Sequence, residues 1–534
     1  MGEQLGWRLK SKPLDWRTFL DKDLGDFQTT PALVSAVLKS LGDRTWARVL
    51  EPTCGVGNFV FGVLRLGSPP LEIQAIEVQD GYYRQVLSAT SAIEKTKVTI
   101  IKANIFACDL QKDIEWSVSG PLLVIGNPPW ITNAQLSALG SGNTPAKTNI
   151  KGLKGLAAIT GDSNFDIAEA IILKIIRELK SEHPTIAMLC KTSVARNVIQ
   201  FGFDAEFPIS DISIRKIDSK KWFNASVDAC LFSFEVALDN RSYEARIYDD
   251  LEAMQPSSIM GFRNGNLVAD TVSYEAVSFV EGRSTETWRQ GVKHDAATVM
   301  ELTEDSSGGW WNRLGENVIV ENDYVYPLMK SSDIAKNTPP RKHVIVTQSR
   351  VGEDTRALAI KAPKLWAYLL DHSRVFEQRK SSIYKGQPPF SIFGIGEYSF
   401  SPFKVVIAGM AKEPRFSVVG PYMGGPTMLD DTCYFLSCHS VQEAGSLADI
   451  LNSPTCLTFL NATIFPDAKR PITKKLLQRI NITALIENVA QQSADDATIK
   501  QAMQLLELRR RKSEAIPPIS NLVASNFLAL FEAE

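Results

Sequence analysis

The chain has 534 residues, 44% of them hydrophobic, and a formal net charge of −2 at pH 7. This length exceeds that of one ordinary domain and provides enough apolar side chains for sizeable cores, so we expect two or three domains. The near-neutral total argues against bulk affinity for nucleic acids, although it says nothing about local basic patches.

The sequence carries no sign of a membrane, a secretion signal or a metal. Its apolar runs are too short to span a bilayer, and the first residues, MGEQLGWRLKSK, lack the apolar core of a signal peptide. We therefore expect a cytoplasmic protein without a membrane partner. The seven cysteines form no CxxC pair, and Cys433, Cys438 and His439 come nearest to ligand spacing. We expect neither a disulfide framework nor a metal site.

Helices and strands alternate in the first part of the chain. Residues 29–42 predict a helix with Thr30 as its N-cap, Pro31 in its first turn and Gly42 just past its end. Apolar runs predict strands at 47–52, 71–78, 97–104, 121–126 and 185–190, and helical spacing predicts helices at 57–67 and 165–179. This β-α-β series predicts a Rossmann-like α/β fold, with a mostly parallel sheet and a ligand site beyond the carboxyl ends of its strands.

A glycine-rich loop, EPTCGVGNF, follows the first predicted strand at residues 51–59. Gly55 and Gly57 allow a sharp turn and a close approach to a ligand, and Glu77, at the end of the next strand, suits a ribose diol. The loop lacks the continuations GxGxxG and GxxxxGK[ST]. Glu51 at its start would repel a pyrophosphate but suits an amino group and a sulfonium, which indicates S-adenosylmethionine.

The strand at 121–126 runs into the stretch Asn127, Pro128, Pro129 and Trp130. The two prolines remove backbone N–H donors and force a stiff, extended exit from the sheet. The side-chain oxygen of Asn127 and the carbonyl of Pro128 can both accept hydrogen bonds from one amino group, while Trp130 offers a flat face. The stretch thus predicts a holder for a planar aromatic amine. The alternative is an ordinary strand-ending turn with a core tryptophan.

Together with GDFQTTP (25–31), IEVQD (76–80) and KKWFNASVDACLF (220–232), these stretches resemble the DNA N6-adenine methyltransferases of restriction-modification systems, in the gamma or TaqI-like motif order. The resemblance covers about the first 240 residues, with Trp130 where Tyr is commoner and Asn104 where Asp is usual. It implies cofactor contacts by a set of residues in these motifs: Thr30, Pro31, Glu51, Pro52, Cys54, Gly55, Gly57, Glu77, Asn104 and Asn127.

The same resemblance implies a catalytic group made of Asn127, Pro128, Pro129 and Trp130, with Phe223 stacking on the far face of a flipped adenine. The lone pair of adenine N6 is delocalised into the ring, and the atom is inaccessible inside a duplex. Hydrogen bonds from N6 to Asn127 and to the Pro128 carbonyl would draw the nitrogen towards tetrahedral geometry for in-line methyl transfer. Cys54 has no basic neighbour in the sequence and is expected to pack rather than react.

Basic residues suggest where duplex DNA is held. Lys147, Lys151 and Lys154 lie in an insert after Trp130, and no Asp or Glu occurs between Glu115 and Asp162. They are expected to contact phosphates, although a solvated loop is an equal alternative for each lysine.

Short strands and turns replace the alternating pattern after about residue 240. We therefore expect a catalytic domain at 1–240 and an α+β target-recognition domain at 241–534 with a C-terminal helical segment. Basic and aromatic residues interleave at 375–404 and 465–480, where Lys469 and Arg470 are expected to contact DNA. A surface helix beginning at Pro471 is the alternative for this pair.

Two other functions remain open. A methyltransferase acting on RNA or on a protein glutamine would also hold a planar amine, and a catalytically silent DNA-binding subunit would keep the fold alone. The large downstream domain favours DNA, and the intact Asn127, Glu77 and glycine loop favour an active enzyme. Asp166 with residues 178–180 mimics a nuclease pattern on a helical segment, so a fused nuclease is not expected, whereas a separate cognate restriction endonuclease is a possible partner.

Overall fold

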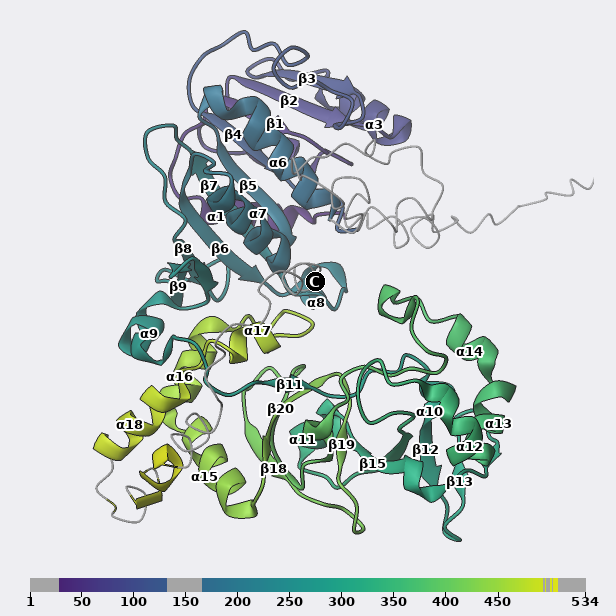
Figure 1. Ribbon diagram of the computed structural model, residues 1–534. Helices are drawn as coiled ribbons and strands as arrows, with labels where there is room; N and C mark the ends of the chain where they lie inside the picture. Colours follow the sequence, from purple (N-terminus) through teal and green to yellow (C-terminus); the bar gives the residue numbers. More distant parts are fainter. Residues whose placement is uncertain (1–27, 132–165, 493–494, 496–499, 502, 508–534) are drawn as a thin grey trace, which may run out of the picture. The chain divides into compact units, whose positions relative to one another are not determined.

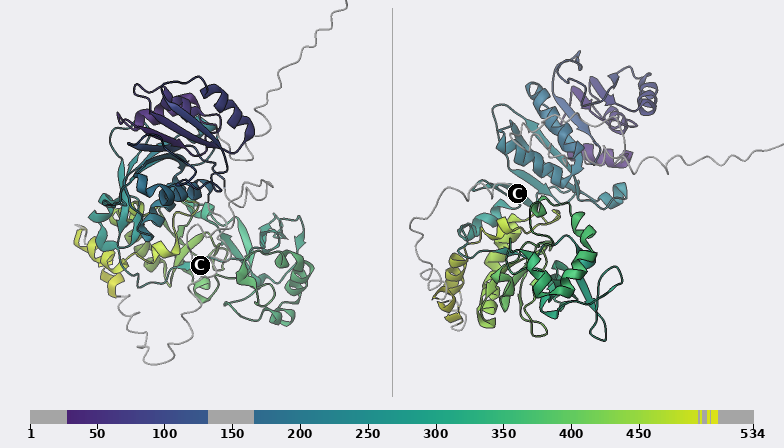
Figure 2. Two further views of the ribbon diagram at one scale, coloured as in Figure 1. Left: turned by 90° about the horizontal axis from the view of Figure 1, so that it is seen from above. Right: turned by 45° about the vertical axis from the view of Figure 1, so that its right-hand side comes forward.

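The computed structural model describes residues 28–131, 166–492, 495, 500–501 and 503–507. The chain divides into two compact units, the first Met1–Val272 and the second Ser273–Glu534. The described part contains no helix long and apolar enough to cross a membrane. Figures 1 and 2 show the chain from three directions, and each unit is described by itself.

The first unit is built on a ten-stranded sheet with the order β10-β9-β8-β6-β7-β5-β4-β1-β2-β3. Its strands are β1 (Arg48–Glu51), β2 (Glu72–Glu77), β3 (Lys97–Lys102), β4 (Leu122–Gly126), β5 (Thr185–Lys191), β6 (Ile209–Ile217), β7 (Ala229–Val236), β8 (Ala245–Tyr248), β9 (Ser258–Arg263) and β10 (Asn266–Val268). Its helices are α1 (Pro31–Ser40), α2 (Asn58–Leu64), α3 (Asp80–Thr90), α6 (Ile167–Leu179), α7 (Thr192–Asp204) and α8 (Ser219–Phe223).

The strand order reverses between β1 and β4. Strands β3, β2, β1, β4 and β5 are parallel, whereas β7 lies antiparallel between β5 and β6. Leu50 of β1 is in register with Val124 of β4, so Glu51 and Gly126 end neighbouring strands. A reversal of this kind opens a crevice beyond the carboxyl ends of the two strands, where ligands of open α/β sheets bind.

Both faces of this sheet are covered. Val49, Ile73 and Leu123 form one hydrophobic core with Leu33 of α1 and Phe59 of α2. The strand residues that point to the opposite face of the sheet are also fully buried, among them Leu50, Val124 and Met188. Because alternate residues face opposite sides, a second layer must cover that face, and Figure 1 shows α6 and α7 lying across the sheet.

The predicted mixed α/β fold with a large, mostly parallel sheet is confirmed. Helix α1 begins as expected: Thr30 is its N-cap and its hydroxyl accepts a hydrogen bond from the Leu33 N–H at 3.3 Å. Gly42 follows the helix with a φ of +78°, in the left-handed region that favours glycine. The strands β8, β9 and β10 extend the same sheet past residue 240, and the boundary between the units lies at Val272.

The second unit has an α+β architecture with two sheets. A four-stranded antiparallel sheet has the order β11-β20-β17-β18, and a six-stranded sheet has the order β14-β13-β12-β16-β15-β19. The strands are β11 (Arg289–Gln290), β12 (Glu301–Glu304), β13 (Trp310–Trp311), β14 (Asn317–Val318), β15 (Val325–Met329), β16 (Lys342–Ile345), β17 (Phe403–Ala408), β18 (Phe416–Val419), β19 (Met428–Leu429) and β20 (Cys433–Cys438).

Several short helices accompany these sheets. They include α9 (Thr271–Ala276), which crosses the unit boundary, α10 (Ala297–Met300), α11 (Ser331–Lys336), α12 (Leu358–Lys361), α13 (Pro363–Asp371), α14 (Ser373–Glu377), α15 (Val441–Leu451), α16 (Pro454–Thr463), α17 (Lys474–Leu477) and α18 (Ile482–Gln492). Cys433 and Cys438 are both buried on β20, five positions apart, so they face opposite sides of the sheet. Within the described residues, no group of three or more His, Cys, Asp or Glu side chains is placed to hold a metal.

Candidate active site

The glycine-rich loop adopts a backbone that only glycine takes easily. Gly55 and Gly57 have φ values of +53° and +80°. A Cβ atom on Gly57 would lie 3.0 Å from both γ-carbons of Val86, so the loop also packs tightly against α3. The Cys54 N–H donates to the Ile76 carbonyl at 2.9 Å, which anchors the loop to the end of β2.

Glu77 closes the loop from the neighbouring strand. Its two carboxylate oxygens accept hydrogen bonds from the N–H groups of Gly55 and Gln79, each at 2.7 Å. Each carboxylate oxygen has a further lone pair, so the group can hold this backbone and still accept from the hydroxyls of a diol. Glu77 therefore has two structural partners that the sequence did not predict, in addition to its expected place at the end of β2.

Glu51 lies at the reversal of the strand order and is 2% exposed. Its Oε2 accepts a hydrogen bond from the Val60 N–H at 3.0 Å, and among the described residues no Lys, Arg or His forms an ion pair with it. Burial, together with the charge of Glu77, raises the pKa of Glu51 well above its ordinary value. A cationic ligand would supply the missing countercharge, which fits the sulfonium and amino groups of S-adenosylmethionine.

Thr29 connects the two motifs and was not predicted from the sequence. Its hydroxyl accepts a hydrogen bond from Asn127 Nδ2 at 3.1 Å, and its carbonyl accepts one from Asn58 Nδ2 at 2.6 Å. Gln28 also lies here, because a Cβ on Gly55 would come within 3.1 Å of its side-chain oxygen. The Thr29-Thr30-Pro31 run marks a helix start in the sequence, and the family resemblance implies cofactor contacts for Thr30 and Pro31 only.

Asn127 and the residues after it lie directly beyond β4. Pro128 is buried, Asn127 and Pro129 are partly exposed, and Pro52 at the end of the neighbouring strand packs against Gly126. Trp130 is 4% exposed and belongs to the core, and its indole N–H donates to the Leu189 carbonyl at 3.2 Å. These contacts fix the turn against β5 and the first core.

Phe223 ends the short helix α8, which Asp218 caps by accepting from the Lys221 N–H at 2.9 Å. The ring of Phe223 meets Trp130 edge to face, with centroids 4.9 Å apart and planes at 71°. The structure thus brings these two predicted residues together. An edge-to-face contact leaves no space for a base between the rings, so the predicted stacking on both faces of a base requires a movement of Phe223.

The other expected cofactor residues have local roles of their own. Asn104 Oδ1 accepts from the Phe106 N–H at 3.0 Å, which forms a turn just beyond β3. Cys54 is 5% exposed, and burial raises the pKa of its thiol. A thiol kept protonated in this way suits packing rather than nucleophilic attack.

The expected DNA contacts are only partly described. Lys147, Lys151 and Lys154 lie outside the described residues. Lys469 is exposed, and Arg470 lies 3.7 Å from Asp431 in an ion pair. The alternative for this pair, a surface helix beginning at Pro471, has a different start in the structure: the helix begins at Lys474, with the Thr473 hydroxyl accepting from the Leu476 N–H. The start moves because Thr473 provides the capping oxygen that Pro471 lacks.

The reversed strand order, the left-handed glycine loop and the buried Glu51 form a site that suits a nucleoside ligand with a cationic group. No protein-family model matches the chain. The chain is 36% identical over 469 residues to the type II methyltransferase M.NspV of Nostoc sp. (strain ATCC 29411 / PCC 7524), across 87% of this chain and 97% of that protein. It therefore belongs to the type II methyltransferase family, which confirms the methyltransferase class, the restriction-modification setting and the cofactor predicted from the sequence.

Two solved structures resemble the chain at low identity. One is the type IIL restriction-modification enzyme MmeI in complex with DNA, with a TM-score of 0.49, 11% identity and coverage of 92% of this chain and 73% of that one. The other is a putative class I S-adenosylmethionine-dependent methyltransferase from Listeria monocytogenes, with a TM-score of 0.31, 14% identity and coverage of 44% and 70%.

Proposed function

We propose that this protein methylates N6 of a flipped adenine at a specific site in duplex DNA, with the TaqI-like motif order. The observation that carries the proposal is the placement of Asn127 to Trp130 directly beyond β4, at the reversal of the strand order. The stretch lies next to Glu51 and the glycine loop, which supports its proposed role as a holder for a planar amine. Family membership supplies the methyl-transfer chemistry.

The chain's own residues divide the work at this site. The Gly55 to Gly57 loop and Glu77 bind the nucleoside part of the cofactor, with Thr30, Pro31, Pro52, Cys54 and Asn104 around it. Glu51 provides negative charge for the cationic part. Asn127 and the Pro128 carbonyl accept hydrogen bonds from the adenine amino group, and Thr29 fixes the Asn127 amide through the 3.1 Å hydrogen bond.

S-adenosylmethionine held by Glu51, Glu77 and the glycine loop would supply an electrophilic methyl group, and the electron pair of its C–S bond would stay on sulfur. Adenine N6 provides the electron pair of the new C–N bond and loses one proton to solvent. Asn127 and Pro128 favour this step because their acceptors draw the N6 hydrogens out of the ring plane, which localises the lone pair. Trp130 and Phe223 stabilise the extruded base after Phe223 moves.

The chain beyond about residue 240 is expected to recognise the target, with Lys469 and Arg470 in contact with DNA. Lys147, Lys151 and Lys154 are expected to contact phosphates. A separate restriction endonuclease with the same target is the expected partner. Two alternatives remain: methylation of RNA or of a protein glutamine, and a silent DNA-binding subunit. A methyl-transfer assay on DNA, RNA and protein distinguishes them.

To test this proposal, the full chain is incubated with labelled S-adenosylmethionine and one of three substrates: duplex DNA, RNA or protein. The products are identified by mass spectrometry. We expect N6-methyladenine in duplex DNA. Single-molecule sequencing of DNA from expressing cells would then give the methylated motif. N4-methylcytosine in DNA, methylation of only RNA or protein, or no transfer to any substrate would each contradict the proposal.

A further inference from the structure

The second unit contains an open groove that includes part of the basic stretch predicted at 465–480. Two segments far apart in the chain line it, one around Arg283 and the other on and after α17. The lining residues are Gly282, Arg283, Lys474, Lys475, Gln478 and Arg479. We call it the Arg283 groove. Apart from Gly282 and Gln478, each of these residues carries a positive charge.

Backbone and side-chain hydrogen bonds fix the two segments against each other. The Ser284 N–H donates to the Gln478 carbonyl and the Gly282 N–H to the Arg479 carbonyl, both at 2.8 Å. Gln478 Nε2 donates back to the carbonyls of Ser284 and Glu286, at 3.1 and 2.9 Å. The cationic side chains therefore project from a backbone that is already ordered, which lowers the entropy lost when a ligand binds.

Charge in the groove is only partly balanced. Arg479 forms a bidentate pair with Glu281, with N–O distances of 2.6 and 2.7 Å. Arg283, Lys474 and Lys475 are exposed, and within the part of the chain that the structure describes none of them lies in an ion pair. The groove thus has three uncompensated positive charges, on a protein whose total charge is −2.

We propose that the Arg283 groove binds backbone phosphates of duplex DNA through Arg283, Lys474 and Lys475. The inference rests on the proposed function and adds a specific contact surface to it. Three exposed, hydrated cations along an open groove suit an extended row of phosphates, whereas a small free anion would need an enclosing set of buried donors. Because the contacts are to phosphates, they add affinity for any duplex and carry no sequence information.

The test is the triple variant Arg283→Gln/Lys474→Gln/Lys475→Gln of the full chain, titrated with a fluorescent duplex at several NaCl concentrations. We expect at least about tenfold weaker binding at low salt. The slope of log K against log[salt] should also fall by about 2 to 3, at about 0.9 for each phosphate that is no longer neutralised. Both changes should be equal on cognate and scrambled duplexes. Each single lysine variant should lower the slope by about 1.

A matched control removes three exposed charges from the same unit, as Arg356→Gln/Lys361→Gln/Lys364→Gln on and near α12 and α13. Figure 1 shows these helices far from α17 within the second unit, and Figure 2 agrees. The control variant should bind duplex DNA and transfer methyl groups as the wild type does. An equal loss of affinity in both triple variants would overturn the inference, because total charge alone would then explain it.

Two further results would also overturn the inference. One is an unchanged salt slope in the triple variant, provided that its melting curve shows it to be folded. The other is selective competition of wild-type DNA binding by inorganic phosphate at constant ionic strength. The latter would indicate a small-anion site. Failure of the proposed function is separable, because the titration needs no turnover. The wild type could bind DNA in a salt-dependent way that the triple variant loses, and yet fail to methylate DNA. That result would reject the proposed enzyme function but support phosphate binding by the Arg283 groove.

Discussion

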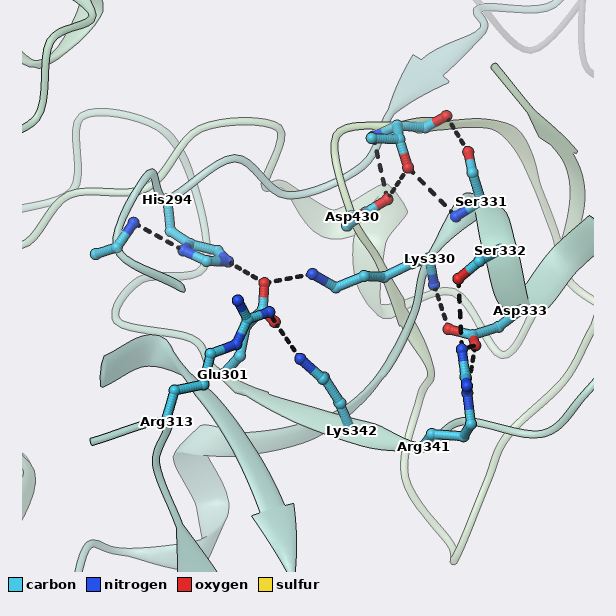
Figure 3. A network of polar contacts seen from close by, with 12 residues as sticks. His294, Glu301, Arg313, Lys330, Ser331, Ser332, Asp333, Arg341, Lys342 and Asp430 are labelled. Atoms are coloured by element: carbon cyan, nitrogen blue, oxygen red, sulfur yellow. Dashed lines mark hydrogen bonds and ion pairs between the residues drawn. The ribbon is translucent and has the colours of Figure 1, made fainter. Parts of the chain in front are cut away.

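Two buried glutamates, one in each unit, have opposite surroundings. Glu51 in the first unit is 2% exposed, accepts a hydrogen bond from a backbone N–H, and has no cation in an ion pair among the described residues. Glu301 in the second unit is 3% exposed and pairs with three cations (Figure 3). Burial and a neighbouring carboxylate raise the pKa of Glu51, whereas the pKa of Glu301 is lowered to about 2.

The Glu301 network is closed within the protein. Its oxygens lie 2.5 Å from Lys330 Nζ, 2.9 Å from Lys342 Nζ and 2.5 Å from an Arg313 nitrogen. Burial favours protonation of Glu301, but the hydrogen bonds from Lys330 and Lys342 outweigh it. His294 lies 3.8 Å away, and burial lowers its pKa to about 4, so it adds no charge at neutral pH.

The difference separates the compensated carboxylate of Glu301 from that of Glu51, which we propose pairs with the cationic part of the cofactor. Glu301 joins β12 to the ends of β15 and β16, and its charge is already compensated. A cation entering the site would favour the ionised form of Glu51. Loss of Glu301 should therefore affect stability first, and changes at the Glu51 site should affect binding and chemistry first.

The largest expected effect is on chemistry in the first unit. Asn127→Ala should lower the single-turnover rate of methyl transfer by about 10² to 10³, because it removes an acceptor that we propose acts mainly in the transition state. Thr29→Val, which removes only the hydroxyl that orients the Asn127 amide, should lower the rate about fivefold. Rapid-quench assays with labelled cofactor measure both. A rate loss matched by an equal loss of DNA or cofactor affinity would contradict the role of Asn127.

The next effect is on stability in the second unit. Glu301→Ala should lower the free energy of unfolding by about 2 to 4 kcal/mol, because three cations lose their shared carboxylate; their partial exposure keeps the value below that of a fully buried pair. Glu304→Ala, an exposed residue of the same strand, is the control and should change little. Urea unfolding measures the difference.

The pH dependence of the Glu301 contribution has a definite sign. Because its pKa is lower in the folded state than its ordinary value of 4.5, the stabilisation is complete above 4.5 and is lost as the pH falls towards about 2. Glu301→Gln should lack this dependence. A variant as stable as the wild type would show that the network contributes nothing.

A smaller effect is expected on cofactor affinity. Glu51→Gln should weaken binding of S-adenosylmethionine by about 1.5 to 3 kcal/mol, since the cationic ligand loses its charged partner. Glu72→Gln is the matched control, because Glu72 is a buried glutamate of the same sheet that already pairs with Lys97 at 3.0 Å. Its cofactor affinity should equal that of the wild type by calorimetry.

The same experiment tests the raised pKa of Glu51. A raised pKa means that ionised Glu51 destabilises the fold increasingly as the pH rises above its ordinary value of 4.5. Binding of a cation favours ionisation, so cofactor binding should release a proton below the folded pKa and tighten as the pH rises through it. Calorimetry in buffers of different ionisation enthalpy detects that proton, and Glu51→Gln should abolish it.

The smallest effect concerns the aromatic pair. Phe223→Ala should weaken extrusion of the target base by about 1 to 2 kcal/mol, because one stacking face is removed. Phe223→Tyr keeps that face and should behave nearly as the wild type. Fluorescence of 2-aminopurine at the target position reports the extruded base. Equal signals from the Ala variant and the wild type would remove Phe223 from the base site.

Much of the first unit could be predicted because its strands are short apolar runs that end in glycine, proline or acidic residues. The end of β4 at Gly126 and the start of α1 after Thr30 are examples in which local chemistry decides the boundary. The contact of Thr29 with Asn127 and the hydrogen bonds of Glu77 to the loop could not be predicted, because they join residues distant in sequence. Trp130 was expected to face a base, but its burial and its bond to Leu189 depend on how β5 packs.

The second unit was less predictable for the same physical reason. Its sheets are made of strands as short as two residues, too short for a hydrophobic period, and they pair across long stretches of chain. The basic stretch at 465–480 could be recognised in the sequence. Its proximity to Arg283 could not, because only tertiary structure brings the two segments together.

The pairing of Ser284 with Gln478 also sets an order of events during synthesis. By the time the ribosome has added residue 272, every strand of the ten-stranded sheet has been made, and the cofactor-binding unit can fold as the chain emerges. In the second unit, the hydrogen bond between Ser284 and Gln478 can form only after α17, some two hundred residues later, has been made. Because this long-range contact carries a large loop-closure entropy, we expect the second unit to complete its folding after the first.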